Sequence, residues 1–236
     1  MKKTYKKRIA IILARKNSKR IKLKNKKQFF GLPIIARVIN TIKKTNLFDT
    51  VMVSTDCDDI AKIAKKHGAE VPFYRSSKNS SDTATVKEVL LEVLNKYKRK
   101  NLSFDYGCYF YGTSVFAKKV DLVKGYKKIH NKNFDVVIPV TKVDKRVWRS
   151  YSLLKDDKIQ FNFPSYKDTP SQKLKDVYLD AGEWGWFVIK KFLKKKDLIT
   201  NNMGSIIKNP KMAQDIDDLK DWNNAKAKFK KFYLNK

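Results

Sequence analysis

Short apolar runs alternate with amphipathic segments along most of this chain, and this alternation limits the possible folds more than any other feature of the sequence. The apolar runs span 8–14, 50–55, 106–112, 134–141 and 184–189, and each has the length of a buried strand. Helix-period segments separate most of them. The alternation predicts βαβ units, and therefore an α/β fold with a mostly parallel sheet flanked by helices.

The expected helices share apolar residues that recur every three or four positions. Pro33 occupies a favourable first-turn position of one helix, and Gly68 can end another. A short strand is expected at 71–75, followed by a polar loop at 76–85. The expected helices span 33–46, 58–68, 86–94 and beyond, 120–130 and 217–232.

The chain is long enough for one sizeable core, since it has 236 residues and 42% hydrophobic content. We expect a single domain over 1–236. In the stretch 142–182 the periodicity fades, and charged, aromatic and turn residues mix. This stretch is expected to form a lid or dimerisation subdomain within the domain.

The sequence argues for a cytoplasmic protein without a membrane span. No run reaches the roughly 18 apolar residues that a spanning helix needs. The basic start of the chain is followed by too few apolar residues for a secretion signal. Cys57 and Cys108 lie far apart without metal-ligand spacing, so they are expected to be reduced core thiols.

The strong positive charge has two explanations. Lysine and arginine number 54 against 23 for aspartate and glutamate, which gives a net charge of +31. Such a charge is typical of nucleic-acid-binding proteins. The lysines are spread over almost every expected helix, however, and the chain is also rich in Asn and Ile. We therefore favour a compositional drift towards Lys, Asn and Ile over a nucleic-acid partner.

The stretch from Leu13 to Asn25, "LARKNSKRIKLKN", concentrates cations directly after the first expected strand, with six basic residues and no carboxylate. In open α/β sheets, ligands bind at the carboxyl ends of the strands. Arg15 can fork across two phosphate oxygens, whereas Lys19 and Lys24 can act as mobile point charges. The amides around Asn17 and Ser18 can line a turn, and Asn tolerates left-handed backbone. The alternative is a solvated basic loop.

This stretch resembles the N-terminal signature of the acylneuraminate cytidylyltransferases, L-x-A-R-x-x-S-K followed by x-x-x-K-N, with one variable position dropped. Many members carry two glycines where this chain has Lys16 and Asn17. The resemblance continues through "GAEVPFYR" and "SSDTATV". Later segments, "TPSQKLKDVYLDAG" and "AQDIDDLKDW", are similar to the pseudaminic acid cytidylyltransferase branch. The resemblance implies a Rossmann-like nucleotide-diphospho-sugar transferase fold.

The resemblance also implies a reaction. The anomeric hydroxyl of a nonulosonic acid attacks the α-phosphate of CTP, releasing pyrophosphate and forming a CMP-sugar. Transfer of this kind depends on alignment and charge stabilisation. The implied catalytic residues are Arg15, Lys19, Lys24 and Asp217. The residues expected to bind CTP are Leu13, Ala14, Arg15, Asn17, Ser18, Lys19, Lys24, Asn25, Arg75, Ser81, Asp82 and Thr85.

Two carboxylates late in the chain are implied as magnesium ligands. Asp215 and Asp217 lie two positions apart in an "x-D-I-D" element, and Mg²⁺ needs only one or two carboxylates beside phosphate. The alternative is that Asp217 caps the final helix. Likewise, Ser81 and Asp82 could cap the long helix that follows them.

The sugar side is less defined by the sequence. The residues expected to face the sugar are Gln172, Tyr178, Asp180, Gly182 and Glu183, where Glu183 replaces the glutamine usual in the branch. Lys142, Arg146 and Arg149 are candidates for the sugar carboxylate, while Trp184 and Trp186 suit the core or a subunit contact. Asp56 is a candidate structural contact to a neighbouring loop, and His67 and His130 are expected at helix ends.

The resemblance leaves other acceptors open, namely legionaminic, neuraminic or eight-carbon ulosonic acids. It implies a homodimer in which the lid of one subunit reaches the other. A non-catalytic basic protein that binds nucleic acid is the competing class.

Overall fold

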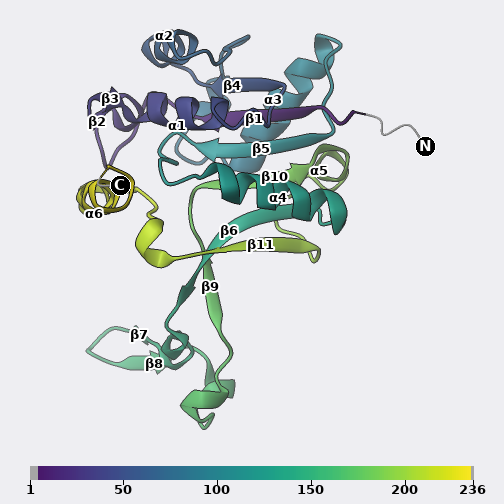
Figure 1. The fold of residues 1–236 in the computed structure, drawn as a ribbon. Coiled ribbons are helices and arrows are strands. Elements are labelled where there is room, and N and C mark those ends of the chain that lie inside the picture. Colours follow the sequence, from purple (N-terminus) through teal and green to yellow (C-terminus); the bar gives the residue numbers. More distant parts are fainter. Residues whose placement is uncertain (1–4, 235–236) are drawn as a thin grey trace.

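The computed structural model describes residues 5–234, and a seven-stranded sheet forms its centre (Figure 1). The strand order is β11-β6-β10-β5-β1-β4, with β9 paired to β6 outside this path. The sheet strands are β1 (Arg8–Leu13), β4 (Thr50–Ser54), β5 (Tyr106–Tyr111), β6 (Val136–Val143), β9 (Val177–Asp180), β10 (Trp184–Val188) and β11 (Met203–Lys208). Two small hairpins add β2 (Gln28–Phe29) with β3 (Leu32–Pro33), and β7 (Tyr151–Leu153) with β8 (Ile159–Phe161).

The pairing confirms a mostly parallel sheet. Strand β1 runs parallel to β4 and β5, and β6 runs parallel to β11. Strand β10 runs antiparallel between β5 and β6, and β9 pairs antiparallel with the end of β6. The α/β class predicted from the alternating pattern is therefore correct. The pattern did not predict that β10 runs antiparallel to its neighbours.

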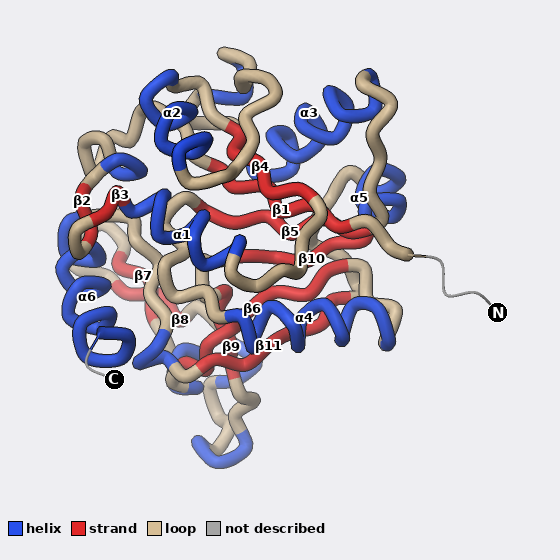
Figure 2. The backbone as a smooth tube through the Cα atoms, turned by 45° about the horizontal axis from the view of Figure 1, so that its top comes forward, coloured by secondary structure: helices blue, strands red, loops and turns tan. Residues whose placement is uncertain are grey.

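Helices cover both faces of the sheet. They are α1 (Ile34–Lys43), α2 (Asp58–Lys66), α3 (Val86–Arg99), α4 (Lys119–Asn131), α5 (Ile189–Lys195) and α6 (Leu219–Phe229). Because side chains alternate along a strand, Ala10 and Ile12 of β1 pack in one core with α1, α2, α4 and α6, and Ile9 and Ile11 pack in the other with α3 and α5. Figure 2 shows α1 and α4 crossing in front of the sheet.

The helix ends follow local sequence. Thr85 caps α3 in a capping box with Glu88, and Asp218 caps α6 in the same way with Asp221. Pro33 is the N-cap of α1 rather than a residue of its first turn. Gly68, at φ +78°, follows the C-cap of α2, as predicted for a helix end.

One expected strand is absent, and several elements were not expected, the β2–β3 hairpin among them. The predicted strand at 71–75 is wrong, because only Glu70 bridges to Met52 before the chain turns at Pro72. Strands β9 and β11 and helix α5 were missed. The pattern therefore located the elements around β1 better than those after residue 142.

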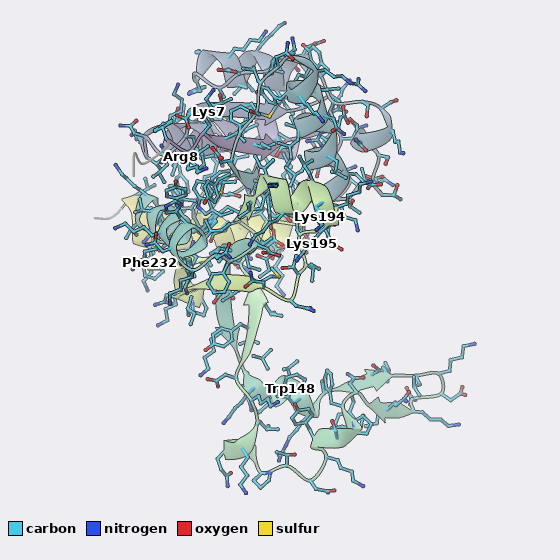
Figure 3. The ribbon with its side chains drawn as sticks, turned by 90° about the vertical axis from the view of Figure 1, so that its right-hand side faces the viewer. Lys7, Arg8, Trp148, Lys194, Lys195 and Phe232 are labelled. Atoms are coloured by element: carbon cyan, nitrogen blue, oxygen red, sulfur yellow. The ribbon has the colours of Figure 1, made fainter. Side chains whose placement is uncertain are left out.

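Residues 144–176 form an arm that projects from the body beyond the β6–β9 ladder (Figure 3). A small aromatic cluster packs within it. Trp148 stacks on Tyr166 at 4.7 Å between ring centroids and meets Phe163 edge to face, while its Nε1 donates to the carbonyl of Lys175. The arm thus has packing of its own.

Several expectations about the whole chain meet the structure here. Cys57 and Cys108 are buried and unpaired, as expected for core thiols. Within residues 5–234, no helix combines the length and apolar character needed to cross a membrane. Part of the basic segment considered above as a secretion signal, residues 1–4, lies outside the described residues.

Candidate active site

A cavity of about 630 Å³ opens at the carboxyl edge of the sheet. Strands β1 and β5 end there side by side, with Leu13 opposite Tyr111 in the parallel register. Because parallel strands deliver their following loops to the same edge, residues distant in sequence meet at this place. The cavity is lined by Leu13, Arg15, Asn17, Ser18, Lys19, Arg20, Lys24, Asn25, Asp82, Ala84, Val86, Val89, Tyr111, Gly112, Thr113, Asp215 and Asp217.

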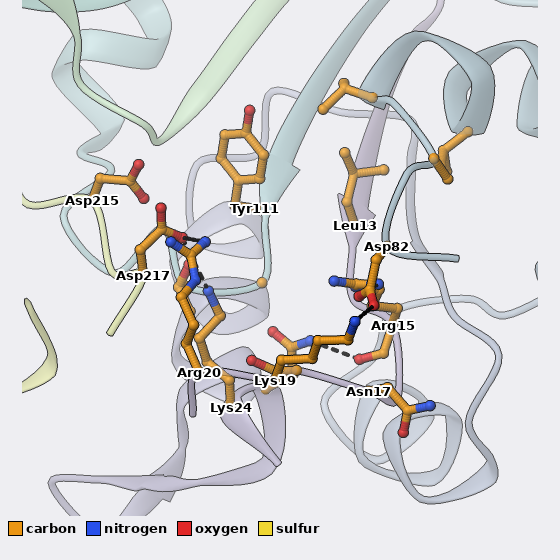
Figure 4. A pocket seen from close by; sticks show the side chains of 17 residues that line it. Leu13, Arg15, Asn17, Lys19, Arg20, Lys24, Asp82, Tyr111, Asp215 and Asp217 are labelled. Atoms are coloured by element: carbon orange, nitrogen blue, oxygen red, sulfur yellow. Dashed lines mark hydrogen bonds and ion pairs between the residues drawn. The ribbon is translucent and has the colours of Figure 1, made fainter. Parts of the chain in front are cut away.

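The loop after β1 forms one wall of the cavity and presents two of its cations to Asp82. Arg15 lies 2.6 Å from one oxygen of Asp82, and Lys19 lies 2.5 Å from the other (Figure 4). Hydrogen bonds from Lys19 and Arg15 lower the pKa of Asp82. Asp82 thus holds the two cations together while staying ionised.

Neighbouring groups fix the course of this loop. Asp56 accepts a hydrogen bond from the backbone amide of Lys16 at 2.6 Å, which confirms the structural role considered for it. Asn25 donates to the carbonyl of Arg15 at 3.0 Å. The left-handed backbone expected at Asn17 is instead found at Leu23, with φ +55°. The loop therefore turns without glycine at a different residue.

The opposite wall carries the two late carboxylates (Figure 4). Residues 213–217 have no regular secondary structure, and Asp215 and Asp217 both line the cavity. Asp217 lies 3.0 Å from the Arg20 guanidinium and 3.7 Å from the Lys24 ammonium. The alternative that Asp217 caps the final helix is wrong, because the adjacent Asp218 does so.

Lys24 joins the two walls. Its ammonium donates to the carbonyl of Ile216 at 2.7 Å in addition to its pairing with Asp217. Burial lowers the pKa of Lys24, while the charge of Asp217 acts in the opposite direction. The cationic loop and the carboxylate segment are therefore connected directly through one side chain.

The two carboxylates fit a divalent cation. Burial raises the pKa of Asp215, and the nearby charge of Asp217 raises it further, so a cation between the two carboxylates would relieve both effects. Within the described residues, no third His, Cys, Asp or Glu completes a metal cluster. Mg²⁺ takes one or two carboxylates and fills its remaining positions with water and phosphate oxygens, so this pair suffices.

Tyr111 stands between the two walls at the end of β5 (Figure 4). Burial raises the pKa of Tyr111 to about 12, with Asp180, Asp215 and Asp217 contributing. Its hydroxyl therefore stays protonated at neutral pH and can donate a hydrogen bond into the cavity.

Four residues expected to contact CTP have other positions. Arg75 is buried and donates to the carbonyl and hydroxyl of Ser54, supporting the end of β4. Thr85 caps α3, which was the alternative assigned to Ser81 and Asp82. Ser81 lines a neighbouring hollow outside the cavity, and Ala14 is fully buried in the core.

The residues expected to face the sugar divide into two groups. Gly182 lies against Asp215, and its backbone amide donates a hydrogen bond to the carboxylate of Asp180 at 2.9 Å. Gln172 and Tyr178 lie on the arm and on β9, outside the set of residues that line the cavity. The expectation for Glu183 needs correction, because its carboxylate is fully buried against Lys208.

The remaining sequence candidates lie outside the set of residues that line the cavity. Trp184 and Trp186 are buried in the core. His67 is the C-cap residue of α2, and His130 lies in the last turn of α4. The three candidates for the sugar carboxylate have partners near or on the arm: Lys142 pairs with Asp176, Arg146 with Asp144, and Arg149 with the carbonyl of Thr169.

Sequence reasoning missed several lining residues. Arg20 was part of the basic stretch but was not singled out. Tyr111, Gly112 and Thr113 directly follow or end β5, so the rule that ligands bind at the carboxyl ends of parallel strands was the available signal. Val86 and Val89 add an apolar patch from the start of α3.

A three-layer α/β fold with a cationic loop facing two carboxylates at the carboxyl edge of its sheet defines the class of nucleotidyltransferases. A model of the family described as "Cytidylyltransferase" matches residues 9–203. The chain belongs to this cytidylyltransferase family and is an enzyme of that class.

Individual relatives agree with this assignment. The pseudaminic acid cytidylyltransferase of Campylobacter jejuni subsp. jejuni serotype O:2 is 29% identical over 225 residues, covering 95% of this chain and 97% of that protein. The CMP-N,N'-diacetyllegionaminic acid synthase of Legionella pneumophila subsp. pneumophila is 31% identical over 135 residues, covering 57% of this chain and 58% of that protein. The first relative is therefore similar over nearly its full length.

The fold is shared with a solved CMP:2-keto-3-deoxy-manno-octonic acid synthetase complexed with CTP. The two superpose with a TM-score of 0.70 at 13% identity, covering 94% of this chain and 97% of that one. This similarity supports the Rossmann-like cytidylyltransferase fold.

Proposed function

We propose that this enzyme transfers CMP from CTP to the anomeric hydroxyl of a nonulosonic acid, pseudaminic acid in the first place, and releases pyrophosphate. The observation that carries the proposal is one cavity in which four cations of the β1 loop face Asp215 and Asp217. The acceptor comes from the relatives that match nearly the whole chain, which are named pseudaminic acid cytidylyltransferases.

The cationic wall has the chemistry needed for the triphosphate. Arg15 offers a planar fork, and Lys19 and Lys24 offer single charges at different depths, because Lys19 is exposed and Lys24 is largely buried. Negative charge grows on the bridging oxygen of the leaving pyrophosphate during transfer, and these cations stabilise it there. Asp82 pairs with two of these cations, Arg15 and Lys19, so the phosphates would compete with its carboxylate for them.

The nucleoside has a separate place in the cavity. Leu13, Ala84, Val86 and Val89 supply apolar lining beside polar groups of Asn25 and Thr113. Such a mixture of apolar walls with a few polar groups suits a pyrimidine base and its ribose. We assign this part of the cavity to cytidine.

Asp215 and Asp217 are assigned to Mg²⁺. When bound, the ion would supply Lewis-acid polarisation of the phosphate that is attacked. The protein's own part is to hold the two carboxylates beside Lys24 and Tyr111, so that the acceptor hydroxyl meets the α-phosphorus in line.

Another ulosonic acid is the second candidate acceptor. The Legionella relative is named for a legionaminic acid product, and the structural neighbour for an eight-carbon ulosonic acid. Glu183 does not decide between them, since it is buried behind the cavity. Gly182 lies against Asp215, and Asp180 and Tyr111 interact electrostatically with the carboxylate wall, so we assign these three residues to the sugar side.

We also propose a homodimer formed through the arm. Tyr151, Leu153 and Ile159 on the β7–β8 hairpin are 57%, 76% and 61% exposed, which is unusual for side chains of this kind gathered on one hairpin. A second copy would cover them. Sedimentation of the full chain and of a Leu153→Asp, Ile159→Asp variant tests this, and an unchanged monomer in both would reject it.

The decisive experiment is pyrophosphate release in the presence of CTP, Mg²⁺ and a panel of nonulosonic and eight-carbon ulosonic acids. Turnover with pseudaminic acid above all others supports the proposal, and turnover with another acid selects the second candidate. No turnover with any acid, together with no CTP binding by calorimetry, would reject both. We place the reaction in the cytoplasm, which suits two buried, unpaired thiols.

A further inference from the structure

A buried ion pair lies behind the carboxylate wall. The Lys208 ammonium lies 2.5 and 2.6 Å from the two oxygens of Glu183 and also donates to the carbonyl of Phe116 at 2.9 Å. Neither side chain lines the cavity, and both are almost completely buried. Because burying two charges costs about as much as their attraction returns, such a pair is weak evidence for stability and calls for another explanation.

The pair joins the two backbone segments that enclose Asp215. On one side, Glu183 follows Gly182, and a Cβ placed on Gly182 would lie 2.5 Å from Cγ of Asp215. On the other side, Lys208 ends β11, and Asp215 follows seven residues later, after the short 3-10 helix Pro210–Met212. The Glu183–Lys208 pair therefore ties together the two backbone segments from which Gly182 and Asp215 extend.

The same segment is tied to β5. The carbonyl of Glu183 accepts hydrogen bonds from the amide of Tyr111, at 3.2 Å, and from the hydroxyl of Ser114. Tyr111 in turn lines the cavity. The backbone of Glu183 is thus hydrogen-bonded directly to a second residue of the cavity, Tyr111.

We propose that the Glu183–Lys208 ion pair is a positioning element that holds Asp215 against Gly182 in the geometry a divalent cation requires. This inference rests on the proposed function for the role of Asp215. A divalent cation needs its carboxylates at fixed positions, and small displacements in supporting groups lower metal affinity and turnover about 10- to 100-fold. Arg15 and Lys19 pair with Asp82 and not with this segment, so we expect CTP affinity to change less than divalent affinity.

A merely stabilising role makes a different prediction, and a double variant separates the two. Replacing both partners of a buried ion pair with apolar side chains of similar volume often restores stability. If the pair only stabilised the fold, a Glu183→Leu, Lys208→Met double variant would regain stability and activity together. If it positions Asp215, stability returns without divalent affinity or turnover.

Asp135 provides a matched control. Its carboxylate is also buried and pairs with Lys191 at 2.8 Å and Lys195 at 2.6 Å, but it precedes β6 at the amino edge of the sheet, away from the cavity. Asp135→Asn should lower the urea midpoint and leave divalent affinity, kcat and KM unchanged.

The experiment compares the full-length wild type, Glu183→Gln, the double variant and Asp135→Asn. Amide hydrogen exchange of residues 209–218, Mn²⁺ affinity without nucleotide, and kcat and KM for CTP are measured. We expect Glu183→Gln to raise exchange in this segment, weaken Mn²⁺ binding and lower kcat by about tenfold each, with KM for CTP within about twofold. The double variant should keep these losses at near wild-type stability.

Two outcomes would overturn the inference. One is wild-type exchange and Mn²⁺ affinity in Glu183→Gln, and the other is recovery of both in the double variant along with its stability. Should the wild type bind no Mn²⁺ and turn over no CTP, the proposed function fails, while exchange of 209–218 still decides whether the pair holds this segment.

Discussion

The guanidinium of Arg20 lies 3.0 Å from Oδ1 of Asp217, so an arginine of the cationic wall neutralises one of the two carboxylates assigned to Mg²⁺. A divalent cation must compete with this arginine. Both side chains are substantially exposed, and ion pairs of this kind contribute about 0.2–1 kcal/mol. We predict that Arg20→Ala tightens Mn²⁺ binding in the absence of nucleotide by about two- to fivefold.

Electron paramagnetic resonance titration of free Mn²⁺ measures this change. Lys22→Ala is the control, because Lys22 belongs to the same loop but does not line the cavity. Equal tightening in both variants would point to a general loss of positive charge instead of competition at Asp217.

Asp217 and Asp218 are neighbours with separable effects. Asp217→Asn should lower kcat at least about tenfold, equivalent to about 1.4 kcal/mol of barrier, without loss of stability. Asp218→Ala should instead cost about 1 kcal/mol of unfolding free energy, since Asp218 caps α6 by accepting from the amide of Asp221. Urea unfolding and pyrophosphate release on both variants measure the two effects, and a reversed pattern would show that the helix cap has been misassigned.

Removal of Arg15 should weaken phosphate stabilisation. We predict that Arg15→Ala lowers kcat/KM for CTP at least about tenfold. Arg146→Ala is the control, because this arginine pairs with Asp144 at the base of the arm. Steady-state kinetics with CTP varied at saturating acceptor measures the change. Wild-type kcat/KM in Arg15→Ala would mean that the triphosphate binds elsewhere.

Substitutions at two glycines with left-handed backbone can distinguish the effect of backbone strain from the effect of steric crowding at Asp215. Gly182 has φ +65° and abuts Asp215, whereas Gly31 has φ +83° and open space where a Cβ would be. Each Gly→Ala change should cost about 1 kcal/mol or more of stability through the backbone. Only Gly182→Ala should also abolish Mn²⁺ binding, because the added methyl group must displace Asp215. Calorimetric titration with Mn²⁺ checks this, and retained binding in Gly182→Ala would show that the carboxylate has room to move.

Glu92, which holds the loop before α3, should make the stability of the protein depend on pH. Burial acts to raise the pKa of Glu92, but hydrogen bonds from Lys96, Ser76 and Asn79 lower it to about 2. A depressed carboxyl pKa adds stability that is present above the unfolded value, 4.5, and is lost as the pH falls towards 2. We predict that Glu92→Gln lowers the urea midpoint at pH 7, and that the difference from wild type shrinks steadily below pH 4.5. A difference that is constant with pH would contradict the assignment to the carboxylate.

The sequence predicted the strands and helices whose apolar residues follow a clear local pattern. The strands at 8–14, 50–55 and 106–112 are buried on both faces and are long enough to be recognised. Strand β9 exposes most of its residues, and β11 buries Gly204 and Lys208 on its inner side, so neither strand shows a clear alternation of apolar and polar residues. Pro72 ended the expected strand at 71–75, since proline cannot donate to a ladder.

The sequence predicted the site residues that lie together on one loop, but not those whose interaction partners are far away in the sequence. The basic stretch placed Arg15, Lys19 and Lys24 at the cavity, because loops after parallel strands meet at one edge. Glu183 was placed with the sugar on the resemblance alone, and its partner, Lys208, lies 25 residues later. A buried ion pair between residues this far apart forms only in the tertiary structure, so no local sequence pattern predicts it.

The antiparallel direction of β9 has a consequence for how this enzyme can diversify. The chain leaves the body along β6 and returns along β9, which pairs antiparallel with the end of β6, so both stems of the arm continue this ladder; Gly182, shortly after β9, lies against Asp215. Lengthening, shortening or exchanging the arm would leave the pairing of the central strands unchanged, because only the β6–β9 ladder connects the arm to the sheet. The arm can therefore change in length or sequence while the residues that line the cavity stay as they are.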